Sequence, residues 1–386
     1  MVALVVVVII VVVAAAVYAV LNLGSPGNAG SSSTAISATW YALTLQAGGS
    51  TFVNPIMQVW ATAFSQYTNG QVQTNYQALG SSSGISGVTK NIFAFAGSDA
   101  TPTASQLGNS TGLYGPLLQI PETLGGVAMF YNIPGVTVSL NMTGQIIADI
   151  YLGKITTWND SAIQSINPGM TLPGKPIVPV RRSDGSGTTF ALTNYLQKTS
   201  TDWNASWSDG QISSSGCPCF STGPFSQLTG LASKGSGGVS GQVQTTPYSI
   251  GYADSYYAFS NNLKAAAILN KAGKFLVPTL DNIAAAANDF STQVQNDPTF
   301  AITNAPGANS YPIATYTYLL VWQNQDKVSS NLQTGYDTAQ FMWWIVNQGQ
   351  AYGPPLYYPK LPASVVTIDE SIIEKIQFNG VPLIHG

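Results

Sequence analysis

The sequence has little charge and a single histidine, and these scarcities exclude several classes of function. Charged residues make up 8% of the 386 residues, whereas soluble domains usually carry roughly 25%. The net charge of −3 provides no positive field for a nucleic-acid backbone, so we expect no nucleic-acid binding. Because His385 is the only histidine, catalytic triads and multi-histidine metal sites are also excluded.

Cysteine is almost as scarce, since Cys217 and Cys219 are the only two in the chain. A tetrahedral metal site would need two further ligands, which neither cysteine nor histidine can supply. Their spacing differs from that of thiol oxidoreductases. The alternatives are a local disulfide or a bridge to another chain. With no activated nucleophile and no dense set of carboxylates, we expect no enzyme, no metal and no cofactor.

The first 21 residues are entirely apolar, and the first charged residue of the chain is Lys90. As a helix they would be about 31 Å long, which matches the hydrocarbon core of a membrane. We expect residues 1–23 to be a retained hydrophobic helix and residues 24–38, rich in Gly, Ser and Pro, to be a flexible linker. Two uses of the helix stay open: a membrane anchor, or the core of an extracellular filament as in type IV pilin-like proteins.

The remaining residues alternate between patterns typical of strands and of helices, which indicates an α/β fold with a parallel or mixed sheet. A chain of this length can form one large protein of two lobes. We predict strands at residues 39–46, 72–79, 92–96, 126–131 and 177–182, and helices at residues 55–67, at residues 144–152 and after Gly187. Ligands of such sheets bind where strand ends meet helix starts.

Four N-x-S/T sequons are compatible with a glycosylated extracytoplasmic surface. They begin at Asn109, Asn141, Asn159 and Asn204.

Three loops rich in Gly, Ser and Thr precede predicted helices, at residues 48–52, 80–86 and 181–190. Unpaired N–H groups and the positive end of the helix dipole favour an anion at such positions. The same residue types also serve as ordinary helix caps and turns, so one loop alone would mean little.

The arginines support an anion site at the third loop, because the chain has only two, Arg181 and Arg182, and both lie there. A guanidinium presents a planar fork of donors suited to an oxyanion. Asp184 is placed to hold Arg182 as a partner. Asp99 follows a predicted strand, and it can be a loop carboxylate or an acceptor for a proton that the ligand carries.

Several segments resemble the phosphate-binding proteins that serve ABC phosphate importers. They are GGSTF, YQALGSSSGI, FAGSDATPT, PETLGGVAMFYNIPG, IADIYLGKITTWND, VRRSDGSGTTFALTNYL, SIGYADSYYAFSNN and YPIATYTYLLVW. The resemblance extends over residues 47–362, although residues 202–241 match nothing in the family. It implies a two-lobed type II periplasmic-binding-protein-like fold, the Venus flytrap, with dehydrated phosphate held between the lobes.

The resemblance also implies the ligand set. Phosphate would be bound by Thr51, the N–H of Phe52, Ser81, Asp99, Arg182, Ser186, the N–H of Gly187 and Thr188, with Asp184 pairing Arg182. Residues 39–128 together with 309–386 would form one lobe and residues 129–308 the other, with strands crossing near residues 126–132 and 311–317.

The expected function is extracytoplasmic binding of inorganic phosphate for delivery to an ABC permease, by a protein tethered to the cell surface by its N-terminal helix. The alternative is a filament subunit that contacts copies of itself through residues 1–21 and carries a phosphate-binding head.

Overall fold

The computed structural model describes residues 42–206 and 230–384. Within these residues, nine strands form one mixed sheet in the order β2-β1-β3-β12-β4-β8-β6-β7, with β9 beside β4. The strands are β1 Leu43–Gly49, β2 Val72–Ala78, β3 Phe95–Ser98, β4 Leu117–Asn132, β6 Val178–Arg182, β7 Leu231–Ser233, β8 Ser249–Asp254, β9 Lys264–Ala265 and β12 Ala314–Trp322.

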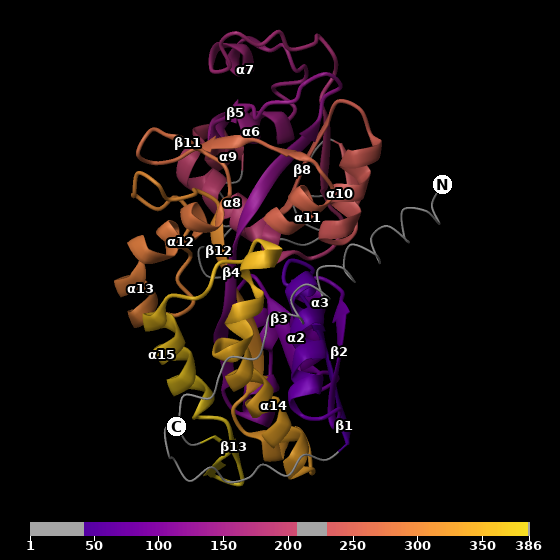
Figure 1. Cartoon of the computed structure of the whole chain (residues 1–386), viewed down its shortest axis with the longest axis vertical. Coiled ribbons are helices and arrows are strands. Elements are labelled where there is room, and N and C mark those ends of the chain that lie inside the picture. Colours follow the sequence, from indigo (N-terminus) through magenta and orange to yellow (C-terminus); the bar gives the residue numbers. More distant parts are fainter. Residues whose placement is uncertain (1–41, 207–229, 385–386) are drawn as a thin grey trace.

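The long strand β4 connects the two lobes of the molecule (Figure 1). Its residues 117–126 pair with β12 in an antiparallel ladder, and its residues 127–132 pair with β8. We call the part around β1, β2, β3 and β12 the lower lobe and the part around β6, β7 and β8 the upper lobe. The sheet is therefore continuous from one lobe into the other.

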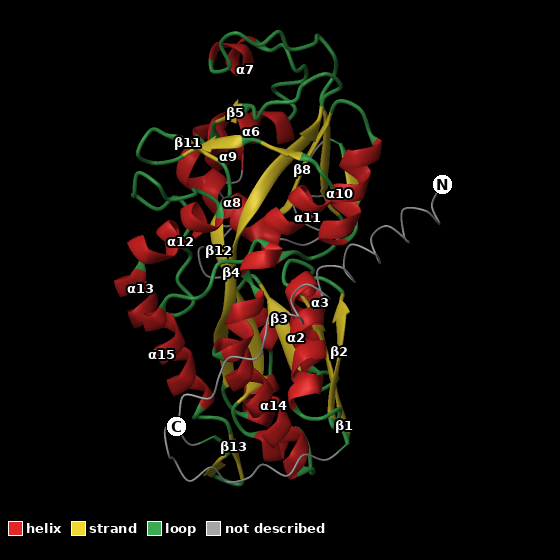
Figure 2. Ribbon diagram, viewed as in Figure 1, coloured by secondary structure: helices red, strands yellow, loops and turns green. Residues whose placement is uncertain are grey.

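Helices cover the sheet in both lobes (Figure 2). Those of the lower lobe are α2 Asn54–Tyr67, α3 Ser81–Thr89, α4 Ala104–Leu107, α5 Ser110–Tyr114, α14 Leu332–Val346 and α15 Ala363–Ile373, with the 3₁₀ turns η2 Gln325–Lys327, η3 Gln348–Tyr352 and η4 Pro354–Leu356. Those of the upper lobe are α6 Gly144–Tyr151, α7 Ser161–Ser165, α8 Gly187–Thr199, α9 Thr201–Ser206, α10 Gly235–Thr245 and α11 Ser255–Ser260. Helices α12 Leu280–Asp289 and α13 Ser291–Asn296 lie along one side.

Short strands complete the described fold. They form a three-stranded sheet of β5 Asn141–Met142, β10 Ala267–Leu269 and β11 Phe275–Leu276, and a pair of β13 Gln377–Phe378 and β14 Val381–Pro382.

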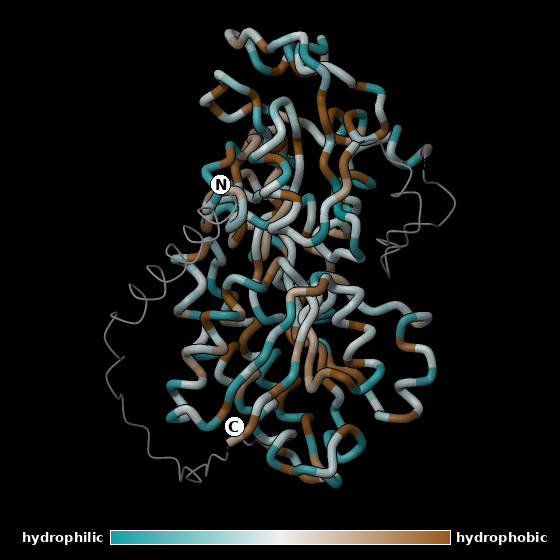
Figure 3. Tube along the Cα trace, turned by 90° about the vertical axis from the view of Figure 1, so that its right-hand side faces the viewer, coloured by the Kyte–Doolittle hydropathy of each residue, from teal (hydrophilic) through white to brown (hydrophobic). Residues whose placement is uncertain are grey.

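Local sequence explains the ends of α2, the helix that follows the first Gly/Ser loop. Pro55 occupies its first turn, where a missing N–H costs nothing. Asn69 and Gly70 then adopt positive φ angles of 53° and 80° and stop it. Its buried face includes Trp60, whose indole donates a 2.7 Å hydrogen bond to the Gly349 carbonyl. Figure 3 shows hydrophobic residues concentrated along the interior strands, and all nine residues of β12 are buried.

Most of the elements predicted from the sequence are confirmed. The predicted helices at residues 55–67 and 144–152, and the one after Gly187, correspond to α2, α6 and α8. The predicted strands at residues 72–79 and 177–182 correspond to β2 and β6. The predicted strand at residues 39–46 is displaced toward the C-terminus, since β1 begins at Leu43.

The predicted strand at residues 92–96 is displaced toward the C-terminus, since β3 is Phe95–Ser98. Asn91 takes a positive φ of 56°, and the N–H of Ile92 donates back to the Gly87 carbonyl over 2.8 Å. These residues therefore close the end of α3.

Several predictions concern residues that the structure does not describe. The hydrophobic helix 1–23 and the first part of the chain after it, Cys217 and Cys219, and His385 lie outside the described residues. Among residues 42–206 and 230–384, no helix has the length and apolarity needed to cross a membrane. The lobe boundaries 39–128 with 309–386 and 129–308 stay a prediction.

The four sequons differ in their surroundings. Asn109, Asn159 and Asn204 are exposed. Asn141 is half-buried, and its amide donates to the Ile166 carbonyl over 3.0 Å. A glycan on Asn141 would have to replace that hydrogen bond. Glycosylation of all four stays a prediction.

Candidate functional site

Three loops of the lower lobe meet at the carboxyl ends of its strands. Strands β2 and β3 lie parallel to β1 on either side of it, so their ends share one edge of the sheet. The chain leaves β1 at Gly49 and starts α2 after Val53, and it leaves β2 at Ala78 and starts α3 at Ser81. Asp99 follows directly on β3. Residues of the first two Gly/Ser loops and Asp99 are thus brought together.

The upper lobe contributes the third Gly/Ser loop, residues 181–190, in the same way. Strand β6, parallel to β7 and β8, ends at Arg182, and α8 begins at Gly187. Ser186 caps this helix, because its hydroxyl accepts a 3.1 Å hydrogen bond from the N–H of Thr189. The sequence motif therefore folds as a strand, a tight loop and a helix start.

The loops of the two lobes are in direct contact. The Ser81 hydroxyl accepts from the N–H of Gly187 over 3.1 Å and from the N–H of Asp99 over 3.3 Å. The N–H of Ser82 donates to the Gly185 carbonyl over 3.3 Å. A Cβ atom on Gly187 would lie 2.6 Å from that of Asp99. Glycine at this position is therefore required for the lobes to come so close.

Arg182 is 4% exposed and is held by Asp184. Its Nε donates to Asp184 over 2.7 Å, and its Nη2 forms an ion pair with the other oxygen of the same carboxylate. Asp184 also accepts from the N–H of Gly235 over 2.9 Å. Burial alone would raise the pKa of Asp184, but Arg182 and this N–H lower it below its ordinary value. The pair is ionised, and Asp184 fixes the direction of the guanidinium.

The Thr188 hydroxyl lies between Asp99 and Arg182. The Asp99 carboxylate accepts from Ser50 and, over 3.2 Å, from Thr188. The Thr188 hydroxyl lies 3.5 Å from Nη1 of Arg182. Burial raises the pKa of Asp99, although the Ser50 hydrogen bond, the charge of Arg182 and the hydroxyls of Thr317 and Thr188 oppose the rise. Asp99 is therefore an acceptor whose charge is only partly compensated.

The structure brings Thr51 to a second helix of the upper lobe that the sequence analysis missed. The Thr51 hydroxyl accepts from the N–H of Ser236, at the start of α10, over 3.0 Å and lies 3.1 Å from the Ser236 hydroxyl. The Tyr257 hydroxyl donates to the Thr51 carbonyl over 3.3 Å. The signal was present as Gly235-Ser236-Gly237-Gly238, a fourth Gly/Ser run at a helix start.

All the residues predicted to bind the anion lie in this one buried region. Phe52 is at the start of α2, where its N–H donates to the Ser50 hydroxyl over 3.0 Å. Ser50 was not predicted and contacts both Phe52 and Asp99. The starts of α2, α3, α8 and α10 converge here, so N–H groups, several hydroxyls and one guanidinium lie close together. Such a donor set suits a dehydrated oxyanion.

Within the described residues, no group of three or more Asp, Glu, His or Cys side chains could hold a metal ion. Arg181 lies beside Arg182 but is half-buried, and its Nη1 donates to the Arg182 carbonyl over 3.4 Å. Its guanidinium therefore takes no part in the contacts around Asp99 and Thr188.

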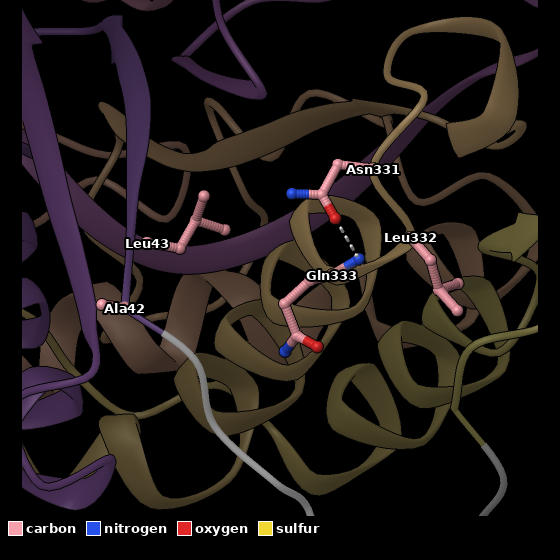
Figure 4. A pocket seen from close by; sticks show the side chains of 5 residues that line it. All are labelled: Ala42, Leu43, Asn331, Leu332 and Gln333. Carbon is pink, nitrogen blue, oxygen red and sulfur yellow. Dashed lines mark hydrogen bonds between the residues drawn. The ribbon is translucent and has the colours of Figure 1, made fainter.

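A surface pocket of about 400 Å³ lies at the opposite end of the lower lobe (Figure 4). It is lined by Ala42, Leu43, Asn331, Leu332 and Gln333. None of these side chains is charged, and Oδ1 of Asn331 accepts from the N–H of Gln333 over 3.0 Å. The pocket therefore offers an anion two neutral side-chain amides and no positive charge.

Comparison with known proteins finds a matching family model and similar proteins of named function. A family model described as a PBP superfamily domain matches residues 27–347. The phosphate-binding protein PstS of Pasteurella multocida is 35% identical to this chain over 340 residues, which are 88% of this chain and 90% of that protein.

Two solved structures share the fold. A phosphate-binding protein from Stenotrophomonas maltophilia has a TM-score of 0.61 and 19% identity, over 86% of this chain and 94% of its own. An ABC-type phosphate transport receptor from Vibrio cholerae has a TM-score of 0.51 and 18% identity, over 82% of this chain and 100% of its own.

Proposed function

Because the chain belongs to the phosphate-binding proteins of the PBP superfamily, we propose that it binds inorganic phosphate between its two lobes. The ligands are Thr51, the N–H of Phe52, Ser81, Asp99, Arg182, Ser186, the N–H of Gly187 and Thr188, with Asp184 orienting Arg182. The observation that carries the proposal is the position of Arg182, a buried guanidinium that is held by Asp184 and lies beside the Thr188 hydroxyl.

Phosphate held in this way exchanges its water shell for fixed protein donors. Neutral N–H and O–H groups can each supply a hydrogen bond without a further buried charge. Arg182 supplies the positive partner, and Asp99 accepts the proton of hydrogen phosphate. The protein binds its ligand and leaves it chemically unchanged, and relatives such as PstS are named as binding proteins.

The protein works outside the cytoplasm and passes phosphate to an ABC permease. The support is the fold shared with the Vibrio cholerae receptor, which is named as part of an ABC-type transport system, together with the PstS relatives. Opening of the two lobes around β4 would release the ligand to the permease.

Residues 1–23 tether the phosphate-binding part of the chain to the cell membrane. Residues 24–38 form a flexible linker that lets this part stand away from the membrane. The support is the uncharged run of residues 1–21, which is long enough for a membrane and is apolar around its whole circumference. The filament alternative uses the same property, because copies of residues 1–21 could pack against one another.

Deletion of residues 1–23 tests the division between helix and head. The shortened chain should stay soluble and bind phosphate with the affinity of the whole chain, because no ligand comes from the deleted part. Gel filtration and calorimetry measure the two properties. An insoluble or non-binding product would place the helix within the fold of the head.

Replacement of Arg182 tests the phosphate site itself. Arg182→Ala leaves the buried anion without its only formal positive partner. Loss of one member of a desolvated charge pair costs about 3–5 kcal/mol, which is roughly two to four decades in Kd. Isothermal calorimetry with inorganic phosphate measures the change. Arg181→Ala is the matched control and should alter Kd less than tenfold, and a similarly small effect of Arg182→Ala would place the anion elsewhere.

A further inference from the structure

Glu122 stands at an irregularity in the strand that joins the lobes. Along the β4–β12 ladder, Thr317 is paired with Thr123 and Tyr318 with Pro121, so Glu122 is an extra residue with no partner on β12. Proline has no N–H to donate, and within sheets it is found at such bulges. A bulge turns a side chain away from its regular direction and is common beside functional sites.

The bulge places the Glu122 carboxyl in the interior, next to the anion site. Glu122 is fully buried, and its Oε1 lies 3.0 Å from the Thr317 hydroxyl. Its Oε2 has no hydrogen-bond partner among the described residues. The backbone is fixed, because Gln350 donates to the Glu122 carbonyl over 2.9 Å. A buried, half-partnered carboxyl is costly as an anion and far less so as a neutral acid.

Thr317 links Glu122 to the site. Thr317 lies close enough to Asp99, the acceptor in the proposed phosphate site, to oppose the rise in the pKa of that carboxyl. A hydroxyl has one proton to donate. If Glu122 is neutral, its O–H can donate to Thr317, and Thr317 can then donate to Asp99. If Glu122 is ionised, the two carboxylates compete for the one hydroxyl proton.

The charges around Glu122 favour its neutral form. Burial raises the pKa of Glu122 to about 8; the Thr317 hydrogen bond opposes this rise and the charge of Asp99 adds to it. Among the described residues, Tyr76 on β2 also feels the charge of Glu122, and its pKa is raised by burial and by the charges of Glu122 and Asp99. Asp254 on β8 also feels the charge of Asp99. Arg182 forms an ion pair with Asp184 and not with Glu122.

We propose that Glu122 is a positioning residue of the phosphate site: as a neutral acid it directs the Thr317 hydroxyl onto Asp99, and its ionisation at alkaline pH weakens phosphate binding. This inference rests on the proposed function. Bound phosphate adds negative charge beside Asp99, so the bound state holds the Glu122 proton more tightly than the free state. The affinity for phosphate is then greatest at low pH, where Glu122 is neutral, and it decreases as pH rises and Glu122 ionises.

The experiment compares the whole chain with Glu122→Gln in phosphate titrations at pH 6, 7, 8 and 9 and constant ionic strength. The amide of the variant keeps the shape and donates to Thr317 at every pH. The titration of phosphate itself cancels in the ratio of the two Kd values. We expect this ratio, wild type over variant, to be near one at pH 6 and about ten at pH 9.

Asp337→Asn is the matched control. Asp337 is another fully buried acid, on α14 and outside the site, and its partner is Gln333. Its variant should follow the pH profile of the wild type. Identical profiles for wild type and Glu122→Gln would overturn the inference while leaving phosphate binding intact. Absence of phosphate binding by all three proteins at every pH would instead refute the proposed function.

A measurement on the wild type alone keeps the inference testable if the Gln variant does not fold. Calorimetry at pH 9 in two buffers of different ionisation enthalpy counts the protons taken up with phosphate. We expect an uptake approaching one proton for each phosphate bound. No uptake would overturn the inference.

Discussion

In the proposed site, Asp99 is the side chain that we expect to set selectivity among anions. An ionised carboxylate repels an oxyanion unless a proton lies between them. Hydrogen phosphate and hydrogen arsenate carry such a proton, and sulfate does not at neutral pH. Selection for a protonated anion requires the ionised form of Asp99, which three hydroxyls and the charge of Arg182 stabilise against the rise in pKa that burial causes.

Asp99→Asn should therefore admit sulfate. The amide can turn its NH₂ toward an anion that has no proton to give, so we expect the preference for phosphate over sulfate to fall at least tenfold. Competition calorimetry with both anions measures the preference. Asp337→Asn should keep the wild-type preference. Equal sulfate and phosphate affinities in the wild type would remove Asp99 from this role.

At the scale of residues, the sequence predicted which side chains would come together where one motif contains them. Arg182, Ser186, Gly187 and Thr188 stand in one short Gly/Ser loop, and their neighbours along the chain fix their geometry. Ser50 and Ser236 were missed because their roles depend on partners 49 and 185 residues away. No local pattern specifies which of several adjacent hydroxyls will turn toward Asp99 or Thr51.

At the scale of elements, the start of α3 in the lower lobe contacts the loop before α8 in the upper lobe, and the contact is made at Gly80. Gly80 precedes α3 with a φ of 96°, and a Cβ atom there would lie 2.4 Å from Oδ2 of Asp184 and 2.9 Å from the Gly185 carbonyl. The contact between α3 and the Arg182 loop therefore has no space for a side chain.

Gly80→Ala should weaken phosphate binding by at least tenfold, because the added methyl group holds the two loops apart. Calorimetry measures the affinity, and urea unfolding measures stability. Gly70→Ala is the matched control: Gly70 has a similar φ of 80° with nothing within 4 Å, so its variant carries the backbone strain alone. If both variants bind phosphate equally well, the two loops do not meet in the phosphate complex.

Elements with a regular pattern were predictable, and those that depend on the whole sheet were not. The sequence suggested only residues 126–131 of β4, since Pro121 and Gly125-Gly126 ordinarily interrupt a strand. In the folded protein all but four of its residues are buried, and pairing with β12 and β8 extends it to 16 residues. Tertiary pairing outweighs local propensity here.

At the scale of the whole molecule, buried acids set the pH dependence of stability. Burial raises the pKa of Asp337 to about 6 and that of Glu122 to about 8. It also raises the pKa values of Asp254 and Asp369 well above their ordinary value. Acids whose pKa is raised by folding stabilise the fold below their unfolded pKa, near 4, and this contribution is lost as pH rises through the folded pKa. Asp184, with a lowered pKa, acts in the opposite direction below pH 4.

The free energy of unfolding should therefore be greatest near pH 4 and decrease toward pH 9. Urea unfolding at pH 5, 7 and 9 measures it. In Asp337→Asn, the free energy of unfolding should decrease by about 1 kcal/mol less between pH 5 and 7 than in the wild type. This is the pH range in which Asp337 releases its proton. A free energy of unfolding that rises steadily to pH 9 would contradict this account.

The position of β12 governs the order in which the chain can fold. In the finished sheet β12 lies between β3 and β4, yet it is made of residues 314–322, long after both neighbours. Until that segment has been synthesised, the lower lobe lacks the strand that joins β3 to β4. Contacts between residues so distant in sequence form slowly. A nascent chain thus stays incompletely folded until late in synthesis, and an unfolded chain is the form that can be threaded through a narrow export channel.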